Sequence, residues 1–152
     1  MPVKRQNVKA RCTSRCSSSY LVATRIFISS GVSISYDATV EIAKKEKAQK
    51  ARPAIKGDVN VEDYDVIFLG YPNWWGDMPM CVYTFIEKHD WNGKTVVPFC
   101  THEGSGLSST ESYIANACKG ATVAKSLAVR GETAQNKRDQ ARKTVNSWLE
   151  KL

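Results

Sequence analysis

Two short segments carry the residue types best suited to hold a ligand. The first is Pro72-Asn73-Trp74-Trp75-Gly76-Asp77, and the second is Thr101-His102-Glu103-Gly104-Ser105-Gly106. The flat faces of adjacent tryptophans suit a planar aromatic ligand, and glycines let the backbone N–H groups of a loop approach a ring system or an anion closely. The alternatives are that the tryptophans pack against the next helix and that the glycine segment is a plain turn.

Each segment follows an apolar run that predicts a buried strand. Val66 to Leu69 precedes the tryptophans, and Thr95 to Cys100 precedes the glycine segment. Continuous apolar runs are typical of parallel strands covered on both faces. Ligands of open α/β sheets bind beyond the carboxyl ends of such strands. Pro98 lies inside the second run, where its missing N–H predicts a β-bulge.

From Asp65 onward, strand and helix patterns alternate. Asp77 is placed to cap a helix that starts at Met78, and Ser108 to Glu111 has the pattern of a capping box for the next helix. A third strand is expected over Thr122 to Val129, followed by a long helix. Alternating elements with short connections predict an α/β fold with a parallel sheet, right-handed crossovers and helices on both faces.

The first 34 residues differ from the rest in charge. The chain carries a net charge of +7, and residues 1–34 supply six basic side chains and no acid, which leaves the remainder nearly neutral. A basic arm that contacts nucleic acid is one interpretation, but the segment lacks interleaved aromatic residues and a recognisable binding module. We therefore expect an atypical basic segment over 1–34, a folded domain over 35–152, and no nucleic-acid partner.

Length and cysteine content limit the remaining possibilities. The chain has 152 residues, enough for one domain with one core. No apolar run is long enough to span a membrane, and Arg25 interrupts the best signal-peptide candidate, Tyr20 to Ile28. The five cysteines form neither a disulfide framework nor a zinc pattern, which favours a reducing compartment. We expect a cytoplasmic monomer or weak homodimer without a membrane or metal partner.

Four pieces of the chain resemble the flavodoxin family, in particular its bacterial flavodoxin-like branch. They are Tyr36-Asp37 with Glu41 to Glu46, Arg52 to Asp58, Tyr64 to Asp77, and Gly93 to Gly106. The resemblance runs from about Tyr36 to the C-terminus, roughly three-quarters of the chain. It implies a flavodoxin-like doubly wound parallel sheet of strand order 2-1-3-4-5, an order for which flavodoxin is itself the standard example.

In that family, two loops at these positions hold the isoalloxazine ring of FMN. The resemblance therefore implies that residues 72–77 form one wall of an FMN site and residues 101–106 the other, with Trp74 or Trp75 stacked on the ring or flanking it. A carboxylate at Glu103 would disfavour the anionic reduced flavin and lower its potential. His102 either donates a hydrogen bond to the ring or faces solvent.

The resemblance implies an FMN-binding electron carrier that works with redox partner proteins. One alternative is a flavin-dependent NAD(P)H or quinone reductase. Another is a degenerate domain that binds no cofactor, since the Ser/Thr/Gly-rich loop that holds the FMN phosphate in the family has no match in residues 1–34. The family's first strand is atypical or missing here, and Tyr20 to Ile28 is the segment available to replace it. A reading-frame change upstream of about Ser35 is one explanation, which the native gene sequence tests.

Overall fold

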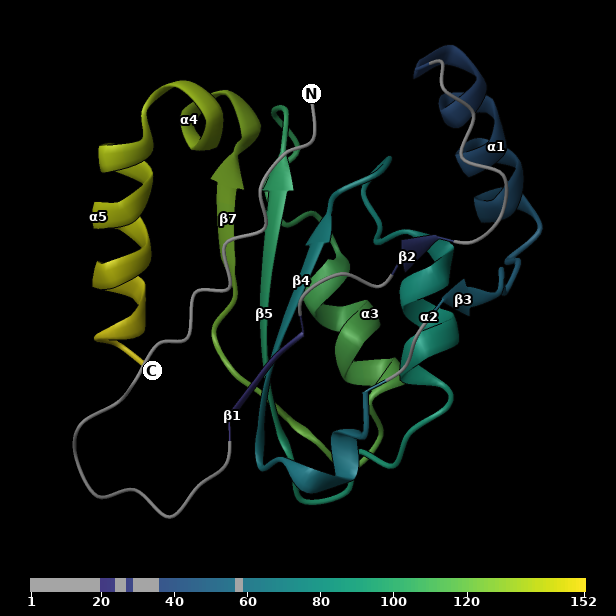
Figure 1. The fold of residues 1–152 in the computed structure, drawn as a ribbon, viewed down its shortest axis with the longest axis horizontal. Helices are drawn as coiled ribbons and strands as arrows, with labels where there is room; N and C mark the ends of the chain where they lie inside the picture. The colour runs from purple at the N-terminus through teal and green to yellow at the C-terminus, as the bar shows by residue number, and fades with distance from the viewer. Residues whose placement is uncertain (1–19, 24–26, 29–35, 57–58) are drawn as a thin grey trace.

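The computed structural model describes residues 20–23, 27–28, 36–56 and 59–152. They form a parallel sheet with helices on both sides (Figure 1). The strands are β1 (Tyr20–Ala23), β2 (Phe27–Ile28), β3 (Ile55–Lys56), β4 (Val66–Pro72), β5 (Thr95–His102), β6 (Thr122–Val123) and β7 (Leu127–Arg130). The helices are α1 (Tyr36–Ala48), the short 3-10 turn η1 (Val61–Asp63), α2 (Met80–Ile86), α3 (Thr110–Ala117), α4 (Gly131–Asn136) and α5 (Arg138–Leu149).

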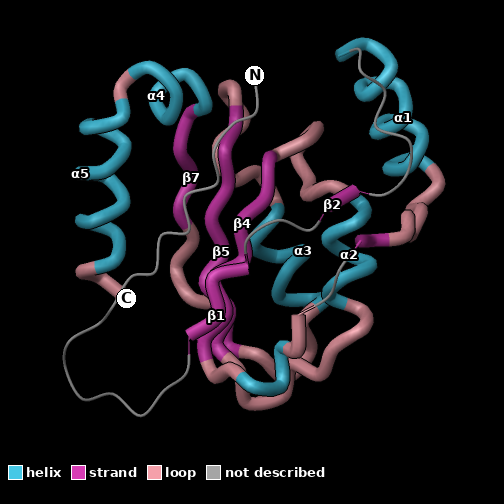
Figure 2. The backbone as a smooth tube through the Cα atoms, in the orientation of Figure 1, coloured by secondary structure: helices cyan, strands magenta, loops and turns pink. Residues whose placement is uncertain are grey.

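The main sheet has the order β1-β4-β5-β6, and β7 extends the β6 side by pairing with the second half of β5. Figure 2 shows β4, β5 and β7 side by side. All of these pairings are parallel. The predicted flavodoxin-like α/β class is confirmed, and β1 lies beside Val66–Leu69 in the place of the family's first strand. Within the described ranges, β2 and β3 pair only with each other, so the place of the family's second strand, at the edge beyond β1, is unfilled there. Residues 1–19, which include most of the predicted basic segment, lie outside the described residues.

The β-bulge predicted at Pro98 is absent from the pairing of β5 with β4, but opposite Pro98 the register with β6 and β7 shifts by one residue, from Val96 with Val123 to Phe99 with Leu127. β5 pairs with β4 without interruption, and Leu69 lies opposite Pro98 in the register. The carbonyl of Val96 accepts from the Ala124 N–H at 2.8 Å, so Val96, and Pro98 two residues later, direct their backbone groups toward β6 and β7. The ladder on that side is already broken between β6 and β7. The proline therefore lies where no N–H is needed.

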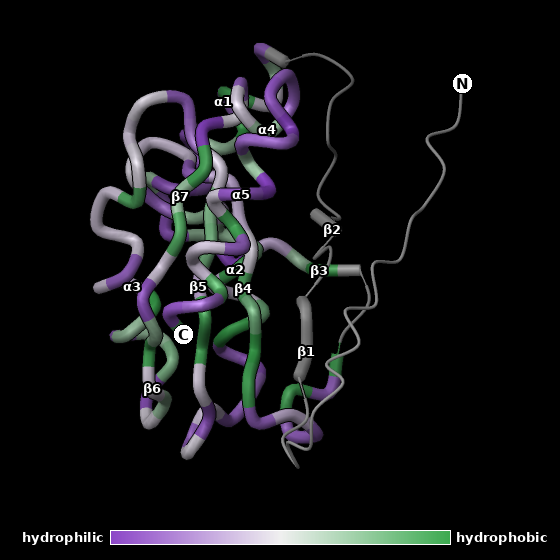
Figure 3. The backbone as a smooth tube through the Cα atoms, turned by 90° about the vertical axis from the view of Figure 1, so that its left-hand side faces the viewer, coloured by the Kyte–Doolittle hydropathy of each residue, from purple (hydrophilic) through white to green (hydrophobic). Residues whose placement is uncertain are grey.

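The two faces of β4 are covered differently. Ile67, Leu69 and Tyr71 are buried in the core cluster, which also contains the inward residues of α2 and α3. On the opposite face, the Phe68 ring lies 6.1 Å from the Trp148 ring of α5, centroid to centroid. The hydrophobic residues of β4 and much of β5 run through the middle of the domain (Figure 3). Alternate side chains of one strand thus contact the two helical layers.

The helix starts differ from those expected. α2 begins at Met80 with Pro79 at the N-cap position, and the Ser109 side chain makes no cap bond to α3. The Glu111 carboxylate instead accepts the Ser126 N–H at 3.2 Å, in the connection between β6 and β7. The predicted capping box is wrong because Glu111 bonds to a backbone group 15 residues away, which a local pattern does not reveal.

A glycine in β4 allows an aromatic ring to lie across the sheet. Gly70 is opposite Phe99 in the register, and a Cβ added at Gly70 would overlap the Phe99 ring. We expect Gly70→Ala to lower the free energy of unfolding by about 1–3 kcal/mol, the usual range for overpacking. Urea denaturation measures it. In a Phe99→Leu background the cost of Gly70→Ala should shrink, and an equal cost in both backgrounds would contradict the assignment.

Candidate functional site

The two segments singled out in the sequence meet at one cavity of about 420 Å³ beyond the carboxyl ends of β4, β5 and β7. This volume falls in the range of small-molecule sites. The predicted residues brought together in its lining are Pro72, Asn73, Trp74, Trp75, Thr101, His102 and Glu103. The other predicted residues, Gly76, Asp77, Gly104, Ser105 and Gly106, lie outside the lining and complete the turn and the loop that carry it.

The tryptophans sit on a tight turn. The Trp74 N–H donates to the Asp77 carbonyl at 2.8 Å, and the Asp77 N–H donates back to the Trp74 carbonyl at 3.1 Å. The central residues Trp75 and Gly76 have φ of 51° and 79°, the signs that a type I′ turn requires. A bulky residue with positive φ is strained and persists only where its surroundings fix it. The turn holds the Trp75 side chain 48% exposed at the cavity rim, with Trp74 half-buried.

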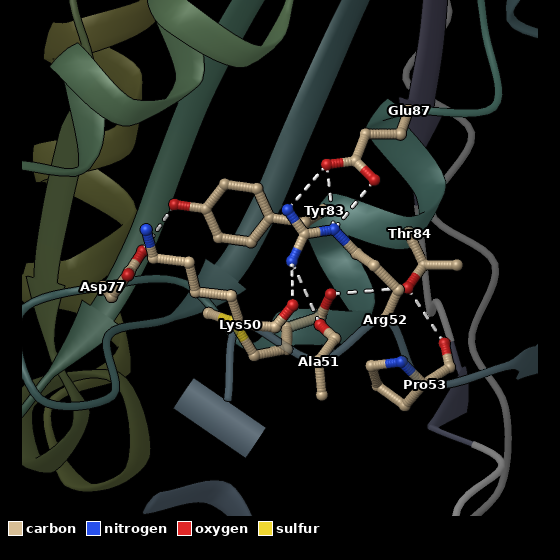
Figure 4. Close-up of polar contacts among 9 residues, drawn as sticks. Lys50, Ala51, Arg52, Pro53, Asp77, Tyr83, Thr84 and Glu87 are labelled. Atoms are coloured by element: carbon tan, nitrogen blue, oxygen red, sulfur yellow. Dashed lines mark hydrogen bonds and ion pairs between the residues drawn. The ribbon is translucent and has the colours of Figure 1, made fainter. Parts of the chain in front are cut away.

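The buried Asp77 side chain supports this turn and does not act as the helix cap that was expected. Its Oδ1 accepts the Met78 N–H at 2.7 Å and the Tyr83 hydroxyl at 2.9 Å. Burial and the bond to Asp77 raise the pKa of Tyr83, so its hydroxyl stays a donor. The Arg52 guanidinium lies over the Tyr83 ring, 4.8 Å from the centroid, and binds the Glu87 carboxylate at 2.7–2.8 Å (Figure 4). This network connects the segment after α1, α2 and the tryptophan turn.

The glycine loop, residues 101–109 up to the start of α3, has its own internal bonds. The Gly104 N–H donates to His102 Nδ1 at 2.9 Å, so that ring nitrogen is an acceptor within the loop. The Glu103 carboxylate turns toward α4, where it accepts the Glu132 N–H at 3.0 Å and lies 3.5 Å from Arg130 Nε. A Cβ added at Gly131 would overlap the Glu103 carboxylate. The negative charge of Glu103 is therefore shared with Arg130 and the start of α4.

Some of the lining comes from residues that the sequence reasoning missed. They are Thr39, Val40 and Ala43 of α1, with Gly131 and Gln135 of α4. Gly131 directly follows β7, so the rule about strand carboxyl ends identifies it once that strand is placed. The α1 residues have helical spacing but no distinctive chemistry, and only the packing of α1 near the turn brings them to the cavity.

In the described part of the chain, no group of three or more His, Cys, Asp or Glu side chains is arranged to hold a metal ion. Among the same residues, no helix combines the length and apolar character needed to cross a membrane.

A parallel sheet with an aromatic turn and a glycine loop beyond adjacent central strands defines a flavodoxin-like α/β protein. A family model for flavodoxin matches residues 36–152. The chain therefore belongs to the flavodoxin family. No curated protein matches the chain.

Solved structures agree on the fold. A candidate flavoprotein from Bacteroides uniformis is 31% identical with a TM-score of 0.61, and the match covers 72% of this chain and 66% of that one, just under two-thirds of its length. A second, from Bacteroides eggerthii, is 32% identical with a TM-score of 0.55, covering 74% and 70%. A flavoprotein in complex with FMN from Lactobacillus acidophilus is 22% identical with a TM-score of 0.53, covering 72% and 74%. At that identity the third likeness concerns the fold alone.

Proposed function

We propose that the chain binds FMN in the cavity beyond β4 and β5 and carries electrons to and from protein partners in the cytoplasm. The observation that carries the proposal is the convergence of the tryptophan turn and the glycine loop on one cavity of about 420 Å³. Family membership supports it, as does the Lactobacillus acidophilus flavoprotein in complex with FMN, which has a similar fold.

The residues present fit a flavin ring. Trp74 and Trp75 offer aromatic faces to a planar ligand. Gly104 and Gly106 have no side chain and adopt positive φ, so the loop backbone can approach a ligand closely. Backbone groups of both loops would hold the polar edge of the ring. FMN, when bound, supplies the electron chemistry. Because the Glu103 carboxylate forms an ion pair with Arg130, we expect it to lower the flavin potential less than an isolated carboxylate would.

A titration of the purified chain with FMN, followed by flavin fluorescence, tests the proposal. We expect saturable quenching by wild type, and an affinity about three- to tenfold weaker after Trp75→Ala, from the usual worth of an aromatic pair. Riboflavin run in parallel measures what the phosphate adds. Tighter binding of FMN than of riboflavin supports the proposal as stated. Equal binding of both would show that the site holds the ring and not the phosphate, and no binding of either overturns the proposal.

A further inference from the structure

One side chain of the site bonds to both loops. Asn73 Oδ1 accepts the Gly76 N–H at 2.9 Å, inside the tryptophan turn. Its Nδ2 donates to the Gly106 carbonyl at 2.8 Å and lies 3.3 Å from Ser108 Oγ, both in the glycine loop. Because an amide N–H only donates and a carbonyl only accepts, the two partners fix the orientation of the Asn73 amide.

The backbone of Asn73 adds a further link at the same place. Its N–H donates to the Thr101 carbonyl at 2.8 Å, at the point where β4 and β5 end together. Asn73 therefore links β4 and β5 directly after their last paired residues, where the two loops begin. By contrast, the bonds from Ser108 Oγ to the Ser105 carbonyl and from the Gly104 N–H to His102 stay within the glycine loop.

Both loops need such support because their backbones have positive φ at several residues. These are Trp75 and Gly76 in the turn, and Gly104, Gly106 and Ser108 in the glycine loop. Left-handed conformations at Trp75 and Ser108 persist only where the surroundings determine them. The Asn73 amide bonds to Gly76, which follows Trp75, and on the other side to Gly106 and to Ser108 itself.

We infer that Asn73 is a positioning residue that clamps the tryptophan turn to the glycine loop and so sets the width of the slot between them. As a statement about flavin, the inference rests on the proposed function. As a statement about the loops, it stands on the hydrogen bonds alone. If the two loops are already held at the right separation, less conformational entropy is lost when a planar ligand binds between them.

Two substitutions remove the clamp in different ways. Asn73→Asp keeps the shape and the acceptor for Gly76, but it removes the donor to Gly106 and sets a carboxylate against a carbonyl. Asn73→Leu removes donor and acceptor with no added charge. Asn146→Asp, at an exposed position of α5, is the matched control for the change of charge.

The first readout is amide hydrogen exchange of the ligand-free protein. We expect faster exchange over 73–77 and 103–109 in both Asn73 variants, with β5 and α3 unchanged and Asn146→Asp like wild type. The second readout is FMN affinity and midpoint potential. We expect an affinity about two- to tenfold weaker, the usual factor for one lost hydrogen bond, together with a shifted potential that a purely global loss of stability would not produce.

The two readouts separate the clamp from the flavin site. If wild type binds FMN and both Asn73 variants match it in exchange, affinity and potential, the clamp is overturned while the proposed function stands. If wild type binds no flavin, the proposed function fails, and loop exchange alone decides the clamp. Faster exchange confined to the two loops supports it, and unchanged exchange overturns it.

Discussion

Raising the pH from about 8 to about 10.5 should lower the free energy of unfolding by several kcal/mol, because three thiols are buried in the core. Cys81, Cys100 and Cys118 are free and only 1–3% exposed. Burial raises the pKa of Cys81 and Cys100 to about 11 and that of Cys118 to about 12. Thiols of the unfolded chain ionise near about 8.5.

The direction of the effect follows from proton counts. Below about pH 8.5 the thiols are protonated in both states, and their contribution to stability is fully present. Above that pH the unfolded chain releases protons that the folded protein keeps, so stability falls as pH rises. Each thiol adds at most about 1.4 kcal/mol per pH unit to the slope. Tyr71, whose pKa burial raises to about 12, adds to the same trend at the alkaline end.

Urea unfolding under reducing conditions, at several pH values between about 7 and 10.5, measures the slope. Cys118→Ala is the informative variant. It should lower stability at neutral pH through the lost packing, yet reduce the alkaline slope by about 1.4 kcal/mol per pH unit. A slope that stays the same after this substitution would show that the thiols are not its source.

Trp148→Ala should cost about 3–5 kcal/mol of stability, the range for removing a large core side chain. Trp148 is the buried residue of α5. Its ring lies against Phe68 and Phe99, 6.1 and 6.4 Å between centroids. Its Nε1 donates to the Lys125 carbonyl at 2.7 Å. The alanine variant loses the apolar contacts and leaves that carbonyl without the indole donor.

The same variant should release α5 before the rest of the domain unfolds. Hydrogen exchange of α5 would then rise more than that of β4 and β5. Trp148→Phe is the matched control, since it keeps an aromatic ring against Phe68 and Phe99 but has no N–H for Lys125. We expect a cost between those of wild type and Trp148→Ala in urea denaturation. Equal costs for both variants would assign the whole effect to the hydrogen bond.

The sequence predicted those features that depend on a continuous local pattern. β4 and β5 are apolar runs, and their loops stand out by residue type and by position at the strand ends. The features it missed depend on partners elsewhere. Asp77 bonds to Tyr83 instead of capping a helix, and Glu111 bonds to Ser126 instead of closing a capping box. Asn73 was expected to belong to the ligand site, but its bonds to both loops could be found only in three dimensions.

The break between β6 and β7 also bears on self-association. A full-length edge strand offers another chain an unbroken row of N–H and C=O groups to pair with, which is a starting point for aggregation. Here, within the described residues, the sheet ends in two pieces of two and four residues. Side chains bond the backbone between them: Trp148 holds the Lys125 carbonyl, and Glu111 holds the Ser126 N–H. The interruption that accommodates Pro98 thus also denies a second molecule a continuous template at this edge of the sheet, the edge formed by β6 and β7.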